Sequence, residues 1–452
     1  MANTSIRRTN SGNGNRKKWT VSWWEKKNKL GAVQRIFSCD EAGNNNHDDF
    51  FQWQTDDKLV IGFYDSGYYL NLTPDRNFRD TNGWYHFVFT WDTAQATASD
   101  RAKFYINGVR ETVFATETYP SQNQDSFINT TEPIEIGKRS DNDTQYLEST
   151  LSHIHFCDGY AYTPSDFGST DSTTGEWKIN TSPRVSYGTN GFFILKDGNS
   201  LTDESPNSNN WSSVSGTLTN TEDCPDNVFC TLNPLDCDLV SGLSNGNNTF
   251  SGFNTGTDYS ATSSTLSASS GKFYWEAKVT DLAEIDQVCV RLQNGVSMSI
   301  QGSNGSAGLQ GTAYGGKSVQ FSNGNKAGDG AQSAYMGGFS ANDIIMVALD
   351  LDNNKITFGR NGQWSNGSGG ADQTYANSTA AFTNLTAGEY YMPAHAMRGY
   401  GGNTGISRYN FGNGYFATTA VSSAGTNASN IGIFEYDVPS GFTALSTKGL
   451  NL

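Results

Sequence analysis

The stretch that decides the fold is Tyr85-His-Phe-Val-Phe-Thr-Trp91, which is followed after a polar linker by Ala102-Lys-Phe-Tyr-Ile106 and then by Asn107-Gly108. Both runs are rich in aromatic and β-branched residues, a composition that favours strands. Asn-Gly is a strong hairpin signal, because both residues tolerate the positive φ angles of a tight turn. Val109 to Phe114 is then expected to be the returning strand, so the region is predicted to be antiparallel β-sheet.

A second stretch repeats this plan in the C-terminal half. Met346-Val-Ala-Leu-Asp-Leu-Asp352 is an apolar run with aspartate at its exit, and Lys355-Ile-Thr-Phe-Gly-Arg-Asn-Gly362 again leads into Asn-Gly. Short runs of this kind, separated by turn residues, recur along both halves with the spacing of a sandwich or barrel. We therefore predict an all-β protein with two antiparallel β-sandwich domains of related design in tandem.

The composition between the two halves is different. Residues 169–238 are dominated by Ser, Thr, Asn, Asp and Pro, and a loop of this length without its own core is uncommon. We expect an ordered connector that packs on the sandwiches, with Trp211 and Phe229 as anchors. The predicted domains are thus residues 1–168 for the first sandwich, 169–238 for the connector and 239–452 for the second sandwich.

Composition excludes several classes of protein. The 452 residues are 13% aromatic and only 17% charged, which excludes bulk disorder. The net charge of -15 argues against a nucleic-acid partner, since such proteins usually carry a basic face. No run approaches the 18 apolar residues of a membrane span, and the first residues lack the apolar stretch of a secretory signal. We expect no nucleic-acid binding and no membrane insertion.

The six cysteines do not form a disulfide framework, because they are few for this length. Cys224, Cys230 and Cys237 are spaced C-x5-C-x6-C, which differs from the close pairs of structural zinc sites. Unpaired thiols and one local disulfide both remain open.

Three motifs of the first half can be compared with known families: Gly83-Trp-Tyr-His-Phe-Val88, Arg101-Ala-Lys-Phe-Tyr-Ile-Asn-Gly-Val109 and Leu151-Ser-His-Ile-His-Phe-Cys-Asp-Gly-Tyr160. Together they resemble the laminin-G and pentraxin-like branch of the concanavalin A-like jelly rolls. The resemblance covers residues 15–168, and it implies a jelly-roll sandwich for the first domain.

Motifs of the second half are Ser270-Gly-Lys-Phe-Tyr-Trp-Glu276, Arg360-Asn-Gly362 and Tyr409-Asn-Phe-Gly412. They resemble SPRY domains, which are bent sandwiches of two antiparallel sheets. The tandem, with Thr231-Leu-Asn-Pro-Leu-Asp236 between its parts, is similar to virion proteins of tailed bacteriophages.

The resemblance implies a structural protein of the virion, acting in host attachment as a tail-fibre tip or adhesin, or as a fibre-attached module that binds host surface glycan. Such a protein assembles in the host cytoplasm and leaves by lysis, so it needs no export signal. Its partners would be other virion proteins and a host surface polysaccharide, and a homo-oligomer fits the symmetry of virions. One alternative is a capsid or tail decoration protein with a purely protein–protein role. A polysaccharide-degrading enzyme is a second alternative.

Sugar binding would use exposed aromatic rings beside polar loops, because a ring stacks on the apolar face of a pyranose. The candidates are Trp53, Tyr64, Tyr68 and Tyr69 in the first half and Tyr314, Trp364 and Tyr400 in the second. Core or loop packing is the alternative for each. Trp23, Trp84 and Trp275 lie in strand patterns and are assigned to cores.

Calcium is the candidate cofactor, because laminin-G and pentraxin-like domains bind it through loop oxygens. Calcium takes six to eight oxygen ligands. The candidate ligands are Asp141, Asn142, Asp143 and Glu148. Asp40, Asp48 and Asp49 are expected to form a second acidic loop. A solvated acidic loop without metal is the alternative.

Enzymatic motifs find little support. Laminarinase-type hydrolases carry Glu-x-Asp-x-x-Glu on one strand, where alternation places the carboxylates on one face. This chain has Glu284-Ile-Asp286-Gln-Val-Cys289, with cysteine at the last position. The HExxH motif of zinc proteases does not occur in the sequence. We expect no enzymatic activity.

Overall fold

The computed structural model describes residues 3–40, 47–252, 259–283, 285–295, 316–328, 331–398 and 405–452. These residues form two compact units, Met1–Asn220 with Cys224–Asp226 and Thr221–Asp223 with Asn227–Leu452. The predicted fold class, all-β with two antiparallel β-sandwiches in tandem, is confirmed. In the ranges just given, no helix is long and apolar enough to cross a membrane.

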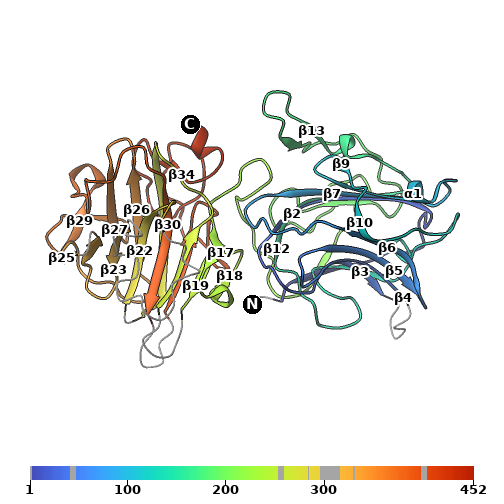
Figure 1. Ribbon diagram of the computed structural model, residues 1–452, viewed down its shortest axis with the longest axis horizontal. Helices are drawn as coiled ribbons and strands as arrows, with labels where there is room; N and C mark the ends of the chain where they lie inside the picture. Colours follow the sequence, from blue (N-terminus) through green and yellow to red (C-terminus); the bar gives the residue numbers. More distant parts are fainter. Residues whose placement is uncertain are drawn as a thin grey trace. The chain divides into compact units, whose positions relative to one another are not determined.

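The first unit contains two large sheets, which lie one over the other in Figure 1. The eight-stranded sheet has the order β10-β6-β5-β4-β3-β11-β1-β16. Its strands are β1 (Ser5–Thr9), β3 (Gln34–Asp40), β4 (His47–Trp53), β5 (Leu59–Asp65), β6 (Tyr68–Pro74), β10 (Phe114–Thr118), β11 (Pro133–Ile136) and β16 (Ser212–Ser215). The six-stranded sheet has the order β15-β12-β2-β7-β8-β9. Its strands are β2 (Lys18–Lys27), β7 (Tyr85–Asp92), β8 (Ala102–Ile106), β9 (Val109–Arg110), β12 (Ser149–Asp158) and β15 (Phe192–Ile194).

Short elements complete the first unit. They are the helix α1 (Ala98–Arg101), the 3-10 helix η1 (Pro164–Asp166) and the hairpin of β13 (Gly168–Thr170) and β14 (Trp177–Ile179). The core between the two large sheets is strongly aromatic, because alternation along each strand points every second ring inward. Trp19, Trp23 and Trp91 enter it from one sheet and Phe51 and Trp53 from the other, all of them fully buried.

The second unit is also built on two large sheets. The seven-stranded sheet contains β17 (Leu232–Cys237), β20 (Tyr259–Ser264), β30 (Tyr391–Arg398), β22 (Ile285–Leu292), β23 (Lys317–Gln320), β24 (Lys326–Gly328) and β25 (Ala331–Ser333), in that order. The other sheet runs through β18 (Leu243–Ser244), β19 (Thr249–Ser251), β31 (Ile406–Asn410), β21 (Lys272–Asp281), β26 (Ile344–Asp350), β27 (Lys355–Arg360), β28 (Gln363–Ser365) and β29 (Ala371–Gln373). A short strand, β34 (Thr443–Ala444), pairs with β21 in parallel.

The remaining elements of the second unit are the hairpin of β32 (Tyr415–Phe416) and β33 (Thr419–Ala420) and the 3-10 helices η2 (Val240–Gly242), η5 (Tyr375–Asn377) and η6 (Gly449–Asn451). Trp275 and the apolar strand β26 face the core of this unit, as the alternating pattern predicted.

The two Asn-Gly hairpins have the same hydrogen bonds. Asn107 N donates to His86 O at 2.8 Å, and His86 N donates back to Asn107 Oδ1 at 2.7 Å. In the second unit Asn361 N donates to Ile344 O at 2.9 Å, and Ile344 N donates to Asn361 Oδ1 at 2.8 Å. Both asparagines have positive φ, 47° and 51°, as this turn requires. The sequence pattern shared by the two halves therefore corresponds to the same turn structure in both units.

The aspartate that ends the first strand of each Asn-Gly pattern also has an equivalent position in the two units. Asp92 lies opposite Lys18 on β2, with an ion pair of 3.4 Å, and Asp350 lies opposite Lys272 on β21, at 3.8 Å. Each unit thus contains an equivalent set of three adjacent antiparallel strands, β2–β7–β8 and β21–β26–β27.

Residues 169–238, expected as an ordered connector that packs on the sandwiches, are divided between the two units. Strand β15 extends the six-stranded sheet and β16 extends the eight-stranded sheet, so most of this segment belongs to the first unit. Trp211 packs edge-on against Phe192 there, with ring centroids 4.9 Å apart. Phe229 lies in the second unit and is bridged to Ser446. None of the six cysteines forms a disulfide.

Candidate functional site

The outer face of the eight-stranded sheet carries a row of four side chains on four adjacent strands: Asp40, Asp48, Tyr64 and Tyr68. The register places Asp40 opposite Asp48, Asp48 opposite Tyr64 and Tyr64 opposite Tyr68. Their neighbours in sequence, Cys39, Asp49 and Phe63, are fully buried in the sandwich. Since successive side chains point to opposite faces, the row lies on the outside. We call it the carboxylate–tyrosine row.

A second feature of this face is a stack of three residues. The Phe50 ring lies over Gly62, where an added Cβ would be only 2.5 Å from Phe50 Cζ. The guanidinium carbon of Arg35 lies 3.8 Å from the centroid of the same ring. Phe50 is therefore held flat between a glycine and a cation, and it supports Tyr68, whose ring meets it edge-on at 6.5 Å.

The guanidinium of Arg35 has acceptors on three of its nitrogens. Nη1 and Nη2 donate to the two oxygens of Asp48 at 2.9 and 2.7 Å, and Nε donates to Gln145 Oε1 at 3.0 Å. Arg35 is only 3% exposed. This bidentate geometry is the strongest that an arginine and a carboxylate form, so Asp48 and Arg35 act as one neutral unit.

Asp40 is the other carboxylate of the row, and its environment is different. Ser140 Oγ donates to its Oδ2 at 2.6 Å, and Ser38 Oγ does so at 3.3 Å. The pKa of Asp40 is raised to about 6, first by burial and then by the neighbouring Asp48 carboxylate. Within the described residues, its Oδ1 has no donor. The two carboxylates of the row therefore differ, one being fixed by an arginine and one retaining a free acceptor.

Two of the aromatic candidates from the sequence meet in this row. Tyr64 and Tyr68 pack edge-to-face with centroids 5.2 Å apart, and Tyr68 is 48% exposed. Tyr69 is turned into the sandwich instead, and its hydroxyl donates to Asp49 at 2.5 Å. A register irregularity between Phe63 and Tyr64, where β5 pairs with β6, turns Tyr69 toward the inside of the sandwich and leaves Tyr68 on the outside.

Two further candidates are core residues, which corrects the expectation of exposed rings. Trp53 is fully buried, and its Nε1 donates to Glu25 at 2.8 Å. Trp364 is 4% exposed and packs edge-on against Tyr375 in the second unit. Tyr314 and Tyr400 lie outside the described residues.

The four candidate calcium ligands are Asp141, Asn142, Asp143 and Glu148. Each carboxylate has its own cation: Arg139 for Asp141 at 2.7 Å, Lys138 for Asp143 at 2.6 Å and Lys29 for Glu148 at 2.6 Å. Asn142 Oδ1 accepts from Thr144. In the part of the chain that the structure describes, no three His, Cys, Asp or Glu side chains are grouped to hold a metal ion. Calcium stays a prediction, and these residues do not converge as a ligand set.

The second acidic group is not a loop. Asp40 and Asp48 face outward on paired strands, whereas Asp49 is buried and accepts from the Tyr69 hydroxyl and from the backbone of Phe127 at 2.7 Å. The pKa of Asp49 is raised to about 7, mainly by burial. Its carboxylate fastens the segment after β10 to the sandwich.

The motif that resembles a hydrolase signature is not an open site. Asp286 is fully buried, with its Oδ1 2.9 Å from Nε2 of the equally buried His395. Cys289 Sγ donates to Ala394 O at 2.9 Å. Glu284 lies outside the described residues. These groups belong to the core packing of the second unit.

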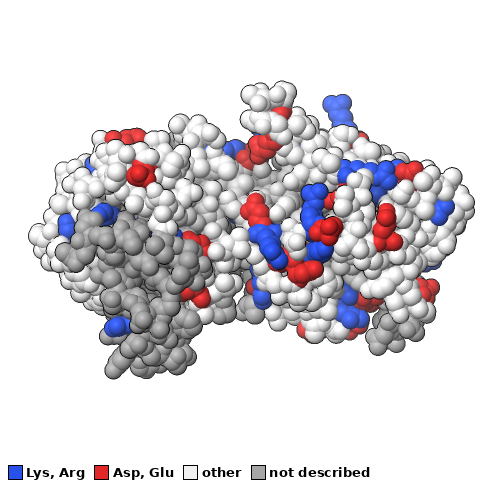
Figure 2. Space-filling view, viewed as in Figure 1, with Lys and Arg blue, Asp and Glu red and all other residues white. Residues whose placement is uncertain are grey.

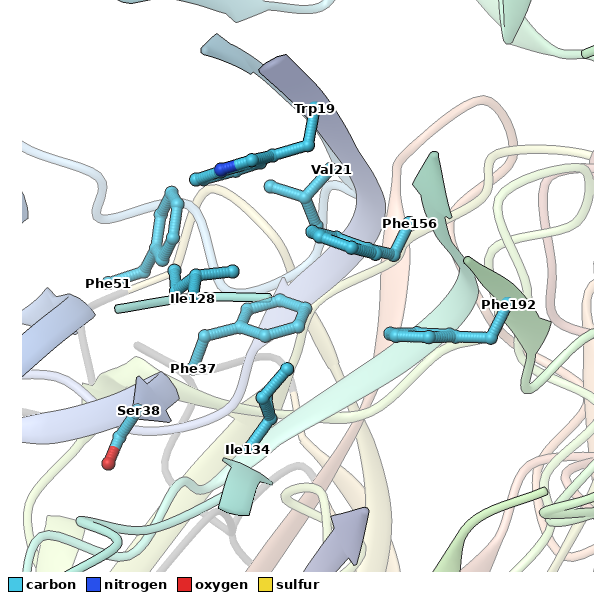
Figure 3. A pocket seen from close by; sticks show the side chains of 9 residues that line it. All are labelled: Trp19, Val21, Phe37, Ser38, Phe51, Ile128, Ile134, Phe156 and Phe192. Carbon is cyan, nitrogen blue, oxygen red and sulfur yellow. The ribbon is translucent and has the colours of Figure 1, made fainter. Parts of the chain in front are cut away.

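The cavity in Figure 3 lies inside the first sandwich and not at the row. Its volume is about 10 Å³, and its walls include the rings of Trp19, Phe51 and Phe156. This space holds at most one water, which would need polar partners that an aromatic lining does not provide. The cavity is a gap in core packing and has no room for a sugar.

Sequence reasoning missed the polar and aromatic partners of the row. Asp48, Phe50 and Gln52 alternate along β4, so a period of two could have placed all three on one face. Arg35 could not be placed, because a register irregularity between Arg35 and Phe37 changes which residues share that face.

Comparisons with known proteins agree with this geometry for the first unit. Residues 2–166 match a laminin-G model described as the concanavalin A-like lectin/glucanases superfamily. No curated protein matches the chain. Among solved structures, the SPRY domain of human HERC1 is 16% identical and has a TM-score of 0.30, with 39% of this chain and 96% of that chain covered. The native heptameric SAP-like pentraxin from Limulus polyphemus is 17% identical, with a TM-score of 0.29 and coverage of 48% and 90%. The first unit thus has a concanavalin A-like lectin/glucanase-type fold, which is compatible with carbohydrate binding.

Proposed function

We propose that this chain is a glycan-binding protein without enzymatic activity, and that the carboxylate–tyrosine row is its binding face. The row supports this because it combines what sugar recognition needs. Tyr68 and Tyr64 offer partly exposed rings, and carboxylate oxygens follow in line across the same face. Aromatic rings that stack on a pyranose, with a few convergent polar groups beside them, are the usual composition of such a site.

The charged surface of the first unit fits a partner of low charge. Figure 2 shows acidic and basic side chains intermixed on the first unit, with wide uncharged areas between them. Lys138 next to this face pairs with both Glu135 at 3.5 Å and Asp143 at 2.6 Å. Intermixed, paired charges favour hydrogen-bonded recognition over long-range attraction of a polyanion.

We further propose that the protein is part of the virion of a tailed bacteriophage, as a tail-fibre tip or fibre-attached module that binds a polysaccharide of the host surface. The tandem of motifs in the sequence supports this setting. In it, the remaining surfaces would contact other virion proteins, and several copies would be arranged around a symmetry axis. If no glycan binds, the alternative hypothesis is a decoration protein that contacts only other proteins.

The test is binding of the purified full-length chain to polysaccharide extracted from the host surface, measured by calorimetry. We expect saturable binding that Tyr68→Ala weakens about tenfold or more, the range for loss of a stacked ring. The matched control is Tyr160→Ala, a tyrosine of similar exposure, 42%, on another part of the same unit. An arm with chelator tests the calcium expectation, and the size distribution of the polysaccharide after incubation tests for hydrolysis. Equal binding by Tyr68→Ala and the parent protein would contradict the site.

A further inference from the structure

From the same face we infer the chemical class of the glycan: it is a neutral or amino sugar, rich in hydrogen-bond donors, and not a uronate or other acidic sugar. This inference rests on the proposed function and goes beyond it, because it predicts which polysaccharides the row accepts and which it rejects. Two observations support it, and they concern different atoms.

The first observation is that the cation at the centre of the face is already bound. An acidic sugar would be recognised through a guanidinium that offers two parallel N–H groups to its carboxylate. The Arg35 guanidinium already donates two N–H groups to the carboxylate of Asp48, at 2.9 and 2.7 Å, and its Nε–H to Gln145. A uronate would have to displace a buried carboxylate from Arg35, which is costly because Asp48 would then be left buried without a counter-charge.

The second observation is that two acceptors on this face lack a donor. Asp40 Oδ1 and Gln52 Oε1 have no donor in the described part of the chain, although the two residues are only 5% and 7% exposed. Both lie on the outward face, since Asp40 pairs with Asp48 and Gln52 pairs with Arg35 across β3 and β4. A buried acceptor without a donor costs free energy, so a partner that brings hydroxyl or ammonium hydrogens gains from satisfying it.

The charge of the row has the same consequence. Asp48 is neutralised by Arg35, whereas Asp40 adds a negative charge to the row once it is ionised. An ammonium group of an amino sugar is favoured there, and a carboxylate of a uronate is repelled.

The experiment is an array of immobilised neutral, amino-sugar and uronate oligosaccharides, probed with the full-length protein, followed by calorimetry on the strongest signal. We expect binding to neutral or amino sugars, with uronates at least about tenfold weaker, and loss of the signal in Tyr68→Ala but not in Tyr160→Ala. The strongest signal on uronates, abolished by Tyr68→Ala, would overturn this inference and leave the proposed function standing. No signal on any class, and none on host polysaccharide, would instead refute the proposed function itself.

A variant designed to change the sugar specificity provides a more discriminating test. Asp48→Asn removes the charge that occupies Arg35 and keeps the shape of the side chain, so the guanidinium becomes available to a carboxylate. We expect uronate binding to rise about tenfold or more relative to the parent protein. Circular dichroism and thermal melting establish that the variant is folded. A folded Asp48→Asn protein that still rejects uronates would overturn the role given to Arg35, and if the variant does not fold, the array with the parent protein and Tyr68→Ala still decides.

Discussion

A buried carboxylate, Glu25, joins the two sheets of the first unit, and its removal is the most informative perturbation of the fold. Trp53 Nε1, from the eight-stranded sheet, donates to Oε1 at 2.8 Å. Trp23 Nε1 and Ser149 Oγ, from the six-stranded sheet, donate to Oε2 at 3.1 Å and Oε1 at 2.7 Å. Glu25 itself is fully buried. We therefore predict that Glu25→Ala destabilises the first unit.

The expected size follows from the groups left behind. Two fully buried indole N–H groups, of Trp23 and Trp53, lose their acceptor, at about 1–3 kcal/mol each. Ser149 is partly exposed and can rotate its hydroxyl toward solvent, so its loss is smaller. Burial raises the pKa of Glu25, which means that the charged form is itself disfavoured in the core and that removing it returns part of the loss. The net destabilisation is about 3 kcal/mol.

The assay is equilibrium unfolding in urea, followed by tryptophan fluorescence and far-ultraviolet circular dichroism, with hydrogen exchange to assign each transition to a unit. Glu276→Ala is the matched control, because Glu276 is a fully buried carboxylate of the second unit that accepts from Tyr274 and from the backbone of Glu435 and Tyr436. Each variant should lower the transition of its own unit only.

The reasoning would be refuted by a loss below about 1 kcal/mol in Glu25→Ala, which would mean that the indoles find other acceptors or water. It would also be refuted if Glu25→Ala weakened protection in peptides of the second unit. Glu25→Gln retains one acceptor oxygen and should fall between the parent and the alanine variant.

Two further predictions concern pH and the stack beneath the row. The carboxyl pKa values of Asp40, Asp49 and Glu276 are raised to about 6, 7 and 7, above the roughly 4 of an unfolded chain, so these groups bind more protons in the folded state between about pH 4 and 7. Their contribution to stability should fall as pH rises through this window, whereas the buried His86, His153 and His155, whose pKa values burial lowers, contribute in the opposite direction. Melting temperatures of Asp49→Asn and the parent protein from pH 4 to 8 separate the two, and an identical pH dependence of both proteins would contradict the burial argument. Gly62→Ala places a Cβ 2.5 Å from Phe50 Cζ, so we expect a loss of about 1–3 kcal/mol and weaker glycan binding, whereas Gly67→Ala, with open space around it, should change neither. Equal melting temperatures for the two alanine variants would show that the Phe50 ring moves without cost.

The fold was predictable because strand chemistry is local. Trp23 and Trp275 were assigned to cores from alternation alone, and both are fully buried. The Asn-Gly turns after β8 and β27 could each be predicted from two residues. The division of the connector could not be read in this way, since β15 and β16 are short strands whose partners lie far away in sequence.

The site was predictable only in part, because exposure depends on register. Tyr64, Tyr68 and Tyr69 look equivalent in sequence, yet one irregularity between β5 and β6 turns Tyr69 inward and leaves Tyr68 outside. The environment of the acidic candidates depends on the fold for a related reason. Glu148 looks free in sequence, but its cation is Lys29, which lies 119 residues away and reaches it through the fold.

The stack of Arg35, Phe50 and Gly62 also constrains how this protein can evolve. The three residues come from three adjacent strands, and each leaves room for the next, so a change at one position alters what is tolerated at the other two. A larger residue at position 62 becomes acceptable only after position 50 has lost its ring, and the arginine at 35 then loses its support. We expect these positions to be replaced together in related chains, while Tyr68 at the open end varies as the recognised sugar changes.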